Sequence, residues 1–145
     1  MNQPLHLQLR EIRRDIRLYQ HQLADQIGVK KAAITCWDSG RKTPFVRHAD
    51  AYARAVDHRL VVADGDTILG DLIGVLPTLP ELRRQRGITQ EVVSRSMWTS
   101  RKAVISLEGR IRRGDNLLLT TVEGYLAGLG LAARLVPAEQ LERAA

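Results

Sequence analysis

Basic side chains gather in two short stretches of the sequence, together with small polar and apolar ones. The first holds Lys30, Lys31, Ala32, Thr35 and Cys36, and the second holds Ser100, Arg101, Lys102, Ile105 and Ser106. Lysine and arginine can donate hydrogen bonds to guanine, and alanine or the methyl group of threonine can contact the methyl group of thymine. On the outer face of a short helix, such side chains suit the major groove of double-stranded DNA.

A helix-turn-helix is the arrangement that would position the first stretch. Leu23 and Ile27 fall on one helical stripe, and Ile34 and Trp37 begin a second one. Gly28 lies between the stripes and can adopt a positive φ without steric cost. Both stripes then face one core, which leaves the outer face of the second helix free.

The flanking sequence predicts two further helices and a hairpin. Residues 5–17 have the apolar spacing of an amphipathic helix, and Pro44 is expected to start a fourth helix that buries Tyr52. Asp64-Gly65 is a typical turn sequence, so we interpret residues 59–69 as a small β-hairpin. Residues 70–77 would then be a connector.

The first half of the chain recurs in the second half after a shift of 70 residues. Six residues repeat unchanged, namely Leu9, Glu11, Arg13, Arg14, Gln20 and Ala33 as Leu79, Glu81, Arg83, Arg84, Gln90 and Ala103. The sequence therefore predicts a mostly α fold of two tandem helix-turn-helix units with a small β element, a short strand following each helical unit. Their ranges are 1–63 and 78–145, joined by a hairpin and connector at 64–77.

Two expectations concern how these units pack. Since only six residues are aromatic, two small aliphatic cores are expected rather than one large core. Because a short apolar strand is unstable alone, the strands near residues 60–63 and 133–136 are expected to share one sheet with Ile68 and Leu69.

The second copy departs from the first at the turn and after the second helix of the helix-turn-helix, which we call the recognition helix. Trp98 replaces Gly28, and because a bulky residue resists positive φ, the geometry of the first turn does not carry over directly to the second copy. Gly109 is interpreted as the glycine that follows the recognition helix, and Gly114 as the counterpart of Pro44. Ser100, or Thr99 before it, is a better N-cap for that helix than Lys30 is in the first copy.

From Gln20 the chain reads Q-x-x-L-A-x-x-I-G-V, then I-x-x-W-D-x-G from Ile34, and then Pro44. This pattern resembles the phage-repressor (Cro, or XRE) helix-turn-helix family. The resemblance covers about residues 9–57. It implies that the recognition-helix residues named above face base edges and that Gln20 and Gln90 clamp a phosphate. Basic loops would grip the DNA backbone through Arg41, Lys42, Arg110, Arg112 and Arg113. The resemblance also implies two structural salt bridges, Arg13 with Asp38 and Arg83 with Glu108.

The charge distribution favours a polyanionic partner. The chain has a formal net charge of +6, with +5 on residues 1–63, −3 on 64–77 and +4 on 78–145. Two basic blocks therefore flank an acidic connector, and both contain a predicted recognition helix.

Several classes of protein are excluded by the sequence. Cys36 is the only cysteine, which excludes an intramolecular disulfide and a cysteine-rich zinc site. The four histidines have no metal-ligand spacing, no apolar run reaches the ~20 residues of a membrane span, and no catalytic pair stands out. We therefore expect no cofactor, no metal, no membrane and no enzymatic activity. The N-terminus is not a signal peptide, so a cytoplasmic, nucleoid-associated protein is expected.

The sequence thus predicts a sequence-specific, double-stranded DNA-binding transcriptional regulator, a repressor with two reading heads in one chain and an operator as its partner. Two alternatives stay open. One is the antitoxin of a toxin–antitoxin pair, which would bind a toxin and also autoregulate its own promoter; a homodimer is the other protein assembly considered. The other is a helix-turn-helix module that binds proteins and has lost DNA binding.

Overall fold

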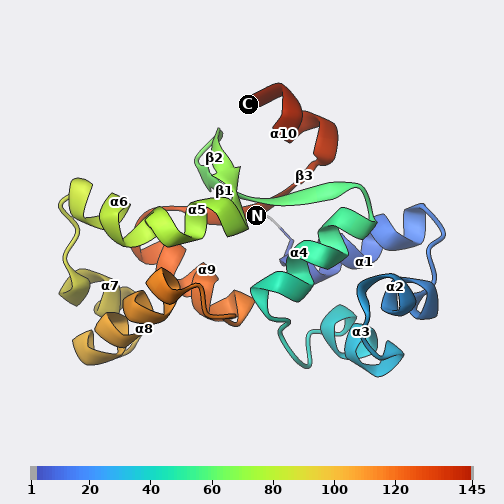
Figure 1. Ribbon diagram of the computed structural model, residues 1–145, viewed down its shortest axis with the longest axis horizontal. Coiled ribbons are helices and arrows are strands. Elements are labelled where there is room, and N and C mark those ends of the chain that lie inside the picture. Colours follow the sequence, from blue (N-terminus) through green and yellow to red (C-terminus); the bar gives the residue numbers. More distant parts are fainter. Residues whose placement is uncertain (1–2, 145) are drawn as a thin grey trace.

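The computed structural model describes residues 3–144 and consists of two helical units on either side of a small sheet (Figure 1). The first unit contains α1 (Leu5–Asp15), α2 (Gln20–Ile27), α3 (Lys31–Asp38) and α4 (Val46–Ala55). The middle contains β1 (His58–Asp64), β2 (Thr67–Asp71), α5 (Leu72–Val75) and the 3₁₀ turn η1 (Leu76–Thr78). The second unit contains α6 (Leu79–Gln85), α7 (Gln90–Ser96), α8 (Arg101–Arg113) and α9 (Leu119–Gly128), followed by β3 (Ala132–Pro137) and α10 (Ala138–Ala144).

The mostly α fold with a small β element is confirmed. In the first unit the predicted stripes meet, since Leu23, Ile34 and Tyr52 are all buried. Gly28 ends α2 in the left-handed region at φ 74°. The first helix is shorter than expected and ends at Asp15, because Arg17 adopts a positive φ of 57°.

The second unit corrects two predictions. Gly109 does not follow the recognition helix but lies inside α8, which continues for 13 residues and buries Ile111 in its last turn. Gly114 is the left-handed cap of α8, not the counterpart of Pro44. The expected N-cap is confirmed at Ser100, whose hydroxyl accepts a hydrogen bond from the backbone N–H of Ala103 at 3.1 Å.

Three backbone positions adopt positive φ in both copies, and each has glycine in only one of them. Arg17 (57°) corresponds to Gly87 (70°), and Gly28 (74°) corresponds to Trp98 (55°). Asp57 (58°) corresponds to Gly130 (76°). The second turn therefore keeps its left-handed residue at Trp98, which bears the strain, although α7 ends one residue earlier than α2 does in the alignment of the two copies.

The strands form one antiparallel sheet in the order β2-β1-β3, which confirms the expected pairing between the two units. In β1 and β3, Leu60 lies opposite Leu135, Arg59 opposite Val136, and Val61 opposite Arg134. The segment predicted as a connector is more ordered than expected, because β2 extends to Asp71 and residues 72–78 form α5 and η1.

The two units are related by an approximate two-fold axis. The backbone N–H of Val46 donates to the carbonyl of Leu117 at 2.7 Å, and the N–H of Leu119 donates to the carbonyl of Pro44 at 2.9 Å. Val46 and Leu119 each begin the last helix of their own unit, so the contact is reciprocal, as in a symmetric dimer. Pro44 thus lies two residues before the helix it was expected to start.

The buried apolar side chains form a single continuous cluster. It extends from Leu5 in α1 through Leu60 in β1 and Leu72 in α5 to Leu126 in α9. The expectation of two separate small cores is wrong, because the sheet buries side chains of both units together. No helix within residues 3–144 is long and apolar enough to cross a membrane.

Candidate nucleic-acid interface

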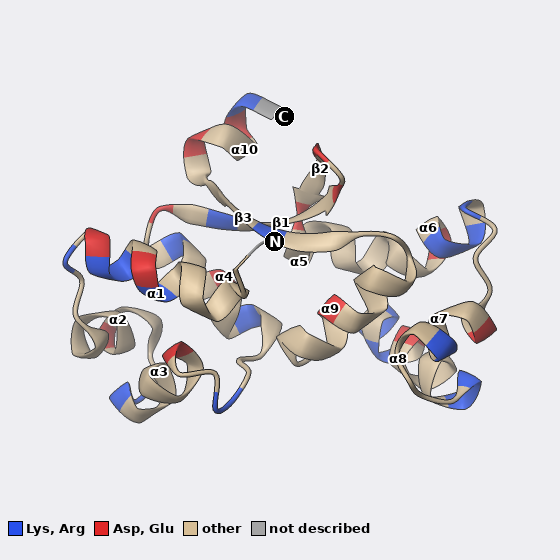
Figure 2. Ribbon diagram, turned by 180° about the vertical axis from the view of Figure 1, so that it is seen from behind, with Lys and Arg blue, Asp and Glu red and all other residues tan. Residues whose placement is uncertain are grey.

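The two helix-turn-helix pairs lie along one edge of the molecule, opposite the sheet and α10 (Figure 1). Figure 2 shows lysine and arginine along this edge, on α3, on α8 and in the loop after α3. Most of the predicted contact residues are exposed, namely Lys30, Lys31, Ala32, Thr35, Arg41, Lys42, Ser100, Arg101, Lys102, Ser106, Arg110, Arg112 and Arg113. Cys36, Gln20 and Gln90 are only partly exposed.

The cations at the start of α3 and α8 are available to a ligand. The ion pairs within residues 3–143 include none of Lys30, Lys31, Arg101 or Lys102. The first turn of each helix also has backbone N–H groups without helical acceptors, which adds partial positive charge. These two helix ends are therefore suited to anionic or acceptor-rich groups.

The basic residues after the recognition helices differ between the units. Arg41 and Lys42 lie in a loop, as expected, whereas Arg110, Arg112 and Arg113 are in the last turns of α8. Asp115 lies 3.1 Å from Arg113, and Glu108 lies 3.8 Å from Arg112. The predicted second basic loop is therefore a helical basic surface whose charge is partly compensated.

Gln20 and Gln90 point their amides into the protein. The Gln20 Nε2 donates to Asp38 at 3.1 Å, and its Oε1 accepts from the Thr35 hydroxyl at 3.0 Å. The Gln90 Nε2 donates to Glu108 at 2.8 Å. A phosphate at these helix ends would therefore meet backbone N–H groups before it met a glutamine amide.

A buried polar network joins the helices of the first unit. Arg13 donates to Asp38 at 2.9 Å, to the Leu18 carbonyl at 2.9 Å and to the Tyr52 hydroxyl at 3.2 Å. Tyr52 in turn donates to Asp38 at 2.8 Å. The salt bridge implied for Arg13 and Asp38 is confirmed, and it links α1, α3 and α4.

The second unit repeats this network around Glu108, which is fully buried. Arg83 donates to it at 2.6 and 3.0 Å and also to the Ile88 carbonyl at 2.9 Å, while the Tyr125 hydroxyl donates to the same carboxylate. Burial alone would raise the pKa of Glu108, but the hydrogen bonds from Arg83, Tyr125 and Gln90 outweigh it and hold that pKa below its usual value. Burial, followed by the hydrogen bond to Glu108, raises the pKa of Tyr125. The second implied salt bridge, Arg83 with Glu108, is confirmed as well.

The outer faces of the two recognition helices carry different chemistry. Thr35 and Cys36 in α3 correspond to Ile105 and Ser106 in α8, and Ile105 is 46% exposed. Trp98 was not predicted from the sequence to be a contact residue, yet it is 96% exposed beside the start of α8. Two features of the sequence indicate that its side chain is exposed. It lies in the turn after α7, and it aligns with Gly28, a position that needs a positive φ and has no side chain to pack.

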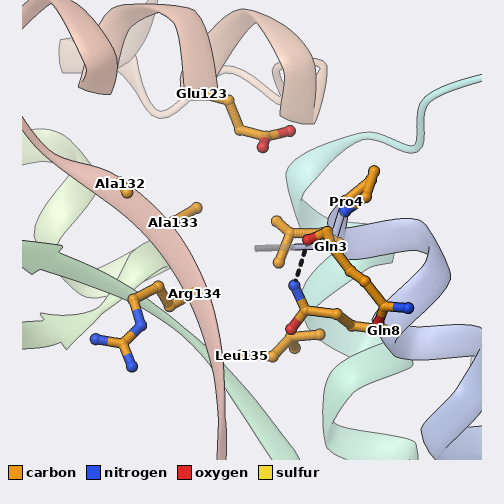
Figure 3. Close-up of a pocket in the computed structure, with 9 residues that line it drawn as sticks. Gln3, Pro4, Gln8, Glu123, Ala132, Ala133, Arg134 and Leu135 are labelled. Atoms are coloured by element: carbon orange, nitrogen blue, oxygen red, sulfur yellow. Dashed lines mark hydrogen bonds between the residues drawn. The ribbon is translucent and has the colours of Figure 1, made fainter. Parts of the chain in front are cut away.

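A cavity of about 590 Å³ lies on the sheet side, between α1, α9 and β3. Its polar lining includes Gln3, Gln8 and Glu123, and burial raises the pKa of Glu123. In Figure 3 Glu123 projects toward Gln3 and Pro4, whereas the guanidinium of Arg134 turns away from the cavity. The Gln8 amide donates to the Gln3 carbonyl at 2.6 Å and the Gln3 amide donates to Glu11 at 3.1 Å, so neither is paired with Glu123, the one acid among the residues that line the cavity.

Within residues 3–143, no three histidine, cysteine, aspartate or glutamate side chains come together as a metal site. Comparison of the chain with models of known families, with curated proteins and with solved structures found no match.

Proposed function

We propose that this chain is a sequence-specific, double-stranded DNA-binding regulator of the phage-repressor type, which represses transcription by occupying an operator. The observation that supports the proposal best is the reciprocal contact between Val46 and Leu117 and between Leu119 and Pro44. It relates two helix-turn-helix units by an approximate two-fold axis and leaves both recognition helices on one edge. Symmetric DNA-binding dimers bring their recognition helices to one face of the duplex in this way.

Each head would read bases with the start of its recognition helix. Lys31 and Arg101 are exposed at the first position of α3 and α8, where they reach the donor and acceptor groups of the major groove. Ala32 and Lys102 follow them and differ in kind, one offering an apolar contact and the other a donor. The helix ends and the basic residues around Arg41 and Arg112 would hold phosphates and set the register.

The joined heads constrain the operator. Because one covalent unit holds both recognition helices on one edge, the two half-sites would lie on one face of the duplex, about one helical turn or ~34 Å apart. Because Lys31, Ala32 and Thr35 differ from Arg101, Lys102 and Ile105, the half-sites would also differ in sequence. We expect a guanine in the half-site under α8, since arginine forms a bidentate contact with that base.

The two alternatives require different surfaces. An antitoxin of this type would use a strand after its helices for assembly, but β1 and β3 already pair with each other inside one chain. A protein-binding module would not need unpaired cations at both recognition helices. Purification with a stoichiometric small protein would favour the antitoxin.

The direct test is to measure binding of a random-sequence duplex at low salt, first by the parent protein and then by variants that lack exposed cations. The variant Lys31→Ala/Arg101→Ala should bind more weakly than the parent protein. The control Arg143→Ala removes an exposed cation on α10, on the opposite side of the molecule, and should bind like the parent protein. Equal binding by all three proteins, or no binding by the parent, would contradict the proposal.

A further inference from the structure

The most unusual surface residue is Trp98, at the turn between α7 and α8. Its side chain is 96% exposed, and its φ of 55° is a conformation that a bulky side chain disfavours. The first unit has Gly28 at the same position, with the same left-handed backbone and no strain. An indole that gains nothing from packing and strains its backbone contributes little to folding.

The charges around Trp98 are more positive than those around Gly28. Arg95, three residues before Trp98, replaces an aspartate of the first copy, and Lys102 replaces an alanine. With Arg101, the second turn is flanked by three exposed cations, whereas the first is flanked by two lysines and an acid. Of these three cations, only Arg95 lies near an acid, with Glu91 at 3.6 Å.

The position of the indole relates it to the recognition helix. Trp98 lies two residues before Ser100, the N-cap of α8, and three before Arg101. In a helix-turn-helix this end of the recognition helix enters the major groove, so a side chain just before it lies beside the rim of the groove. An aromatic surface flanked by cations offers a duplex both apolar contact with its sugars and neutralisation of its phosphates.

We propose that Trp98 is a DNA-contacting residue of the second head, whose indole packs against the sugar–phosphate backbone beside the half-site read by α8. This inference rests on the proposed function. The first head has only Gly28 at this point, so the contact would strengthen binding of one half-site and fix the orientation of the protein on an asymmetric operator.

Tryptophan fluorescence tests the contact directly, because the chain has two tryptophans and Trp37 is only 8% exposed. The parent protein is titrated with a random-sequence duplex at low salt, and quenching by the neutral quencher acrylamide is measured. DNA should protect the exposed indole from the quencher. In Trp98→Gly the remaining emission comes from Trp37 and should change little.

The same variant separates binding from folding. Trp98→Gly places glycine at a positive φ, so its melting temperature should equal or exceed that of the parent, while its affinity for DNA should fall about tenfold, the effect of no longer burying roughly 55 Å² of apolar surface. The control Val92→Gln replaces another exposed apolar residue of α7 by its first-copy counterpart and should bind DNA like the parent.

The outcomes distinguish this inference from the function on which it rests. A parent protein that binds no duplex overturns the proposed function. A parent that binds duplex DNA with Trp98 still fully accessible to acrylamide, and with unchanged affinity in Trp98→Gly, overturns the role of Trp98 alone. The role of Trp98 would also be overturned if anionic vesicles, but not DNA, protected its indole from acrylamide. Protection by self-association of the protein in the absence of DNA would overturn it too.

Discussion

Replacing Glu108 by alanine should destabilise the protein far more than removing any exposed acid. The Glu108 carboxylate is fully buried and accepts hydrogen bonds from Arg83, Gln90 and Tyr125. In Glu108→Ala the Arg83 guanidinium, in a residue only 6% exposed, keeps the Ile88 carbonyl as a partner but loses its counter-charge. An unpaired buried charge is what makes such a change severe.

The expected loss follows from that geometry. Breaking one side of a buried ion pair lowers the free energy of unfolding by about 3–5 kcal/mol. For a chain of this size each kcal/mol shifts the melting temperature by roughly 2–4 °C, so a fall of roughly 6–20 °C is expected. Adding Arg83→Met should recover part of the loss, because it removes the unpaired charge.

Urea denaturation followed by circular dichroism measures the difference. The matched control is Glu81→Ala, which breaks the exposed pair between Glu81 and Arg84, with side chains 59% and 53% exposed. That control should change the free energy of unfolding by less than about 0.5 kcal/mol. Similar losses in the two variants would refute the reasoning.

Three further predictions concern pH, salt and the sheet. The pKa of Glu108 is lower in the folded protein than its usual 4.5, so the ionised carboxylate stabilises the fold above pH 4.5. This stabilisation is lost as the pH falls through the pKa of Glu108 in the folded protein. Acid should therefore lower the melting temperature of the parent more than that of Glu108→Gln. Arg112→Ala/Arg113→Ala should weaken binding to all duplexes alike. It should also flatten the fall of the binding constant with salt, whose log–log slope is about −0.9 per phosphate contact. A loss of binding confined to specific duplexes would show that these arginines read bases. Leu60 is buried where the two units meet, so Leu60→Ala should lower the free energy of unfolding by about 2–5 kcal/mol. The variant should still unfold in a single transition in urea. Two separate transitions would contradict a shared core.

Much of the fold could be predicted because the apolar spacing is regular and the chain repeats itself. Leu23 and Ile34 have the spacing of helices that share a core, and Arg83 and Glu108 repeat the spacing of Arg13 and Asp38. The pairing of β1 with β3 followed from the instability of an isolated short strand.

The errors arose where a local signal was outweighed by packing. Gly109 looked like a helix end, but Val104, Leu107 and Ile111 continue one buried stripe through it, and the left-handed cap moves to Gly114. Nothing in the types of Pro44 and Leu119 indicates the backbone hydrogen bond that joins them, because any residue can supply a carbonyl oxygen.

The interface was only partly predictable for a similar reason. Exposure of Lys31 and Arg101 follows from the helical stripes, whereas the inward orientation of the Gln20 amide depends on the distance to Asp38. Sequence periodicity fixes which face a residue occupies but not which partner its side chain reaches.

Selection of bound duplexes from a random DNA pool tests the central claim most directly. We predict enrichment of duplexes with two dissimilar motifs on one face, their centres about one helical turn apart, with guanine in one motif whose preference is relaxed by Arg101→Ala and not by Lys31→Ala. No enrichment at low salt, or a perfectly palindromic site indifferent to Arg101→Ala, would contradict the account.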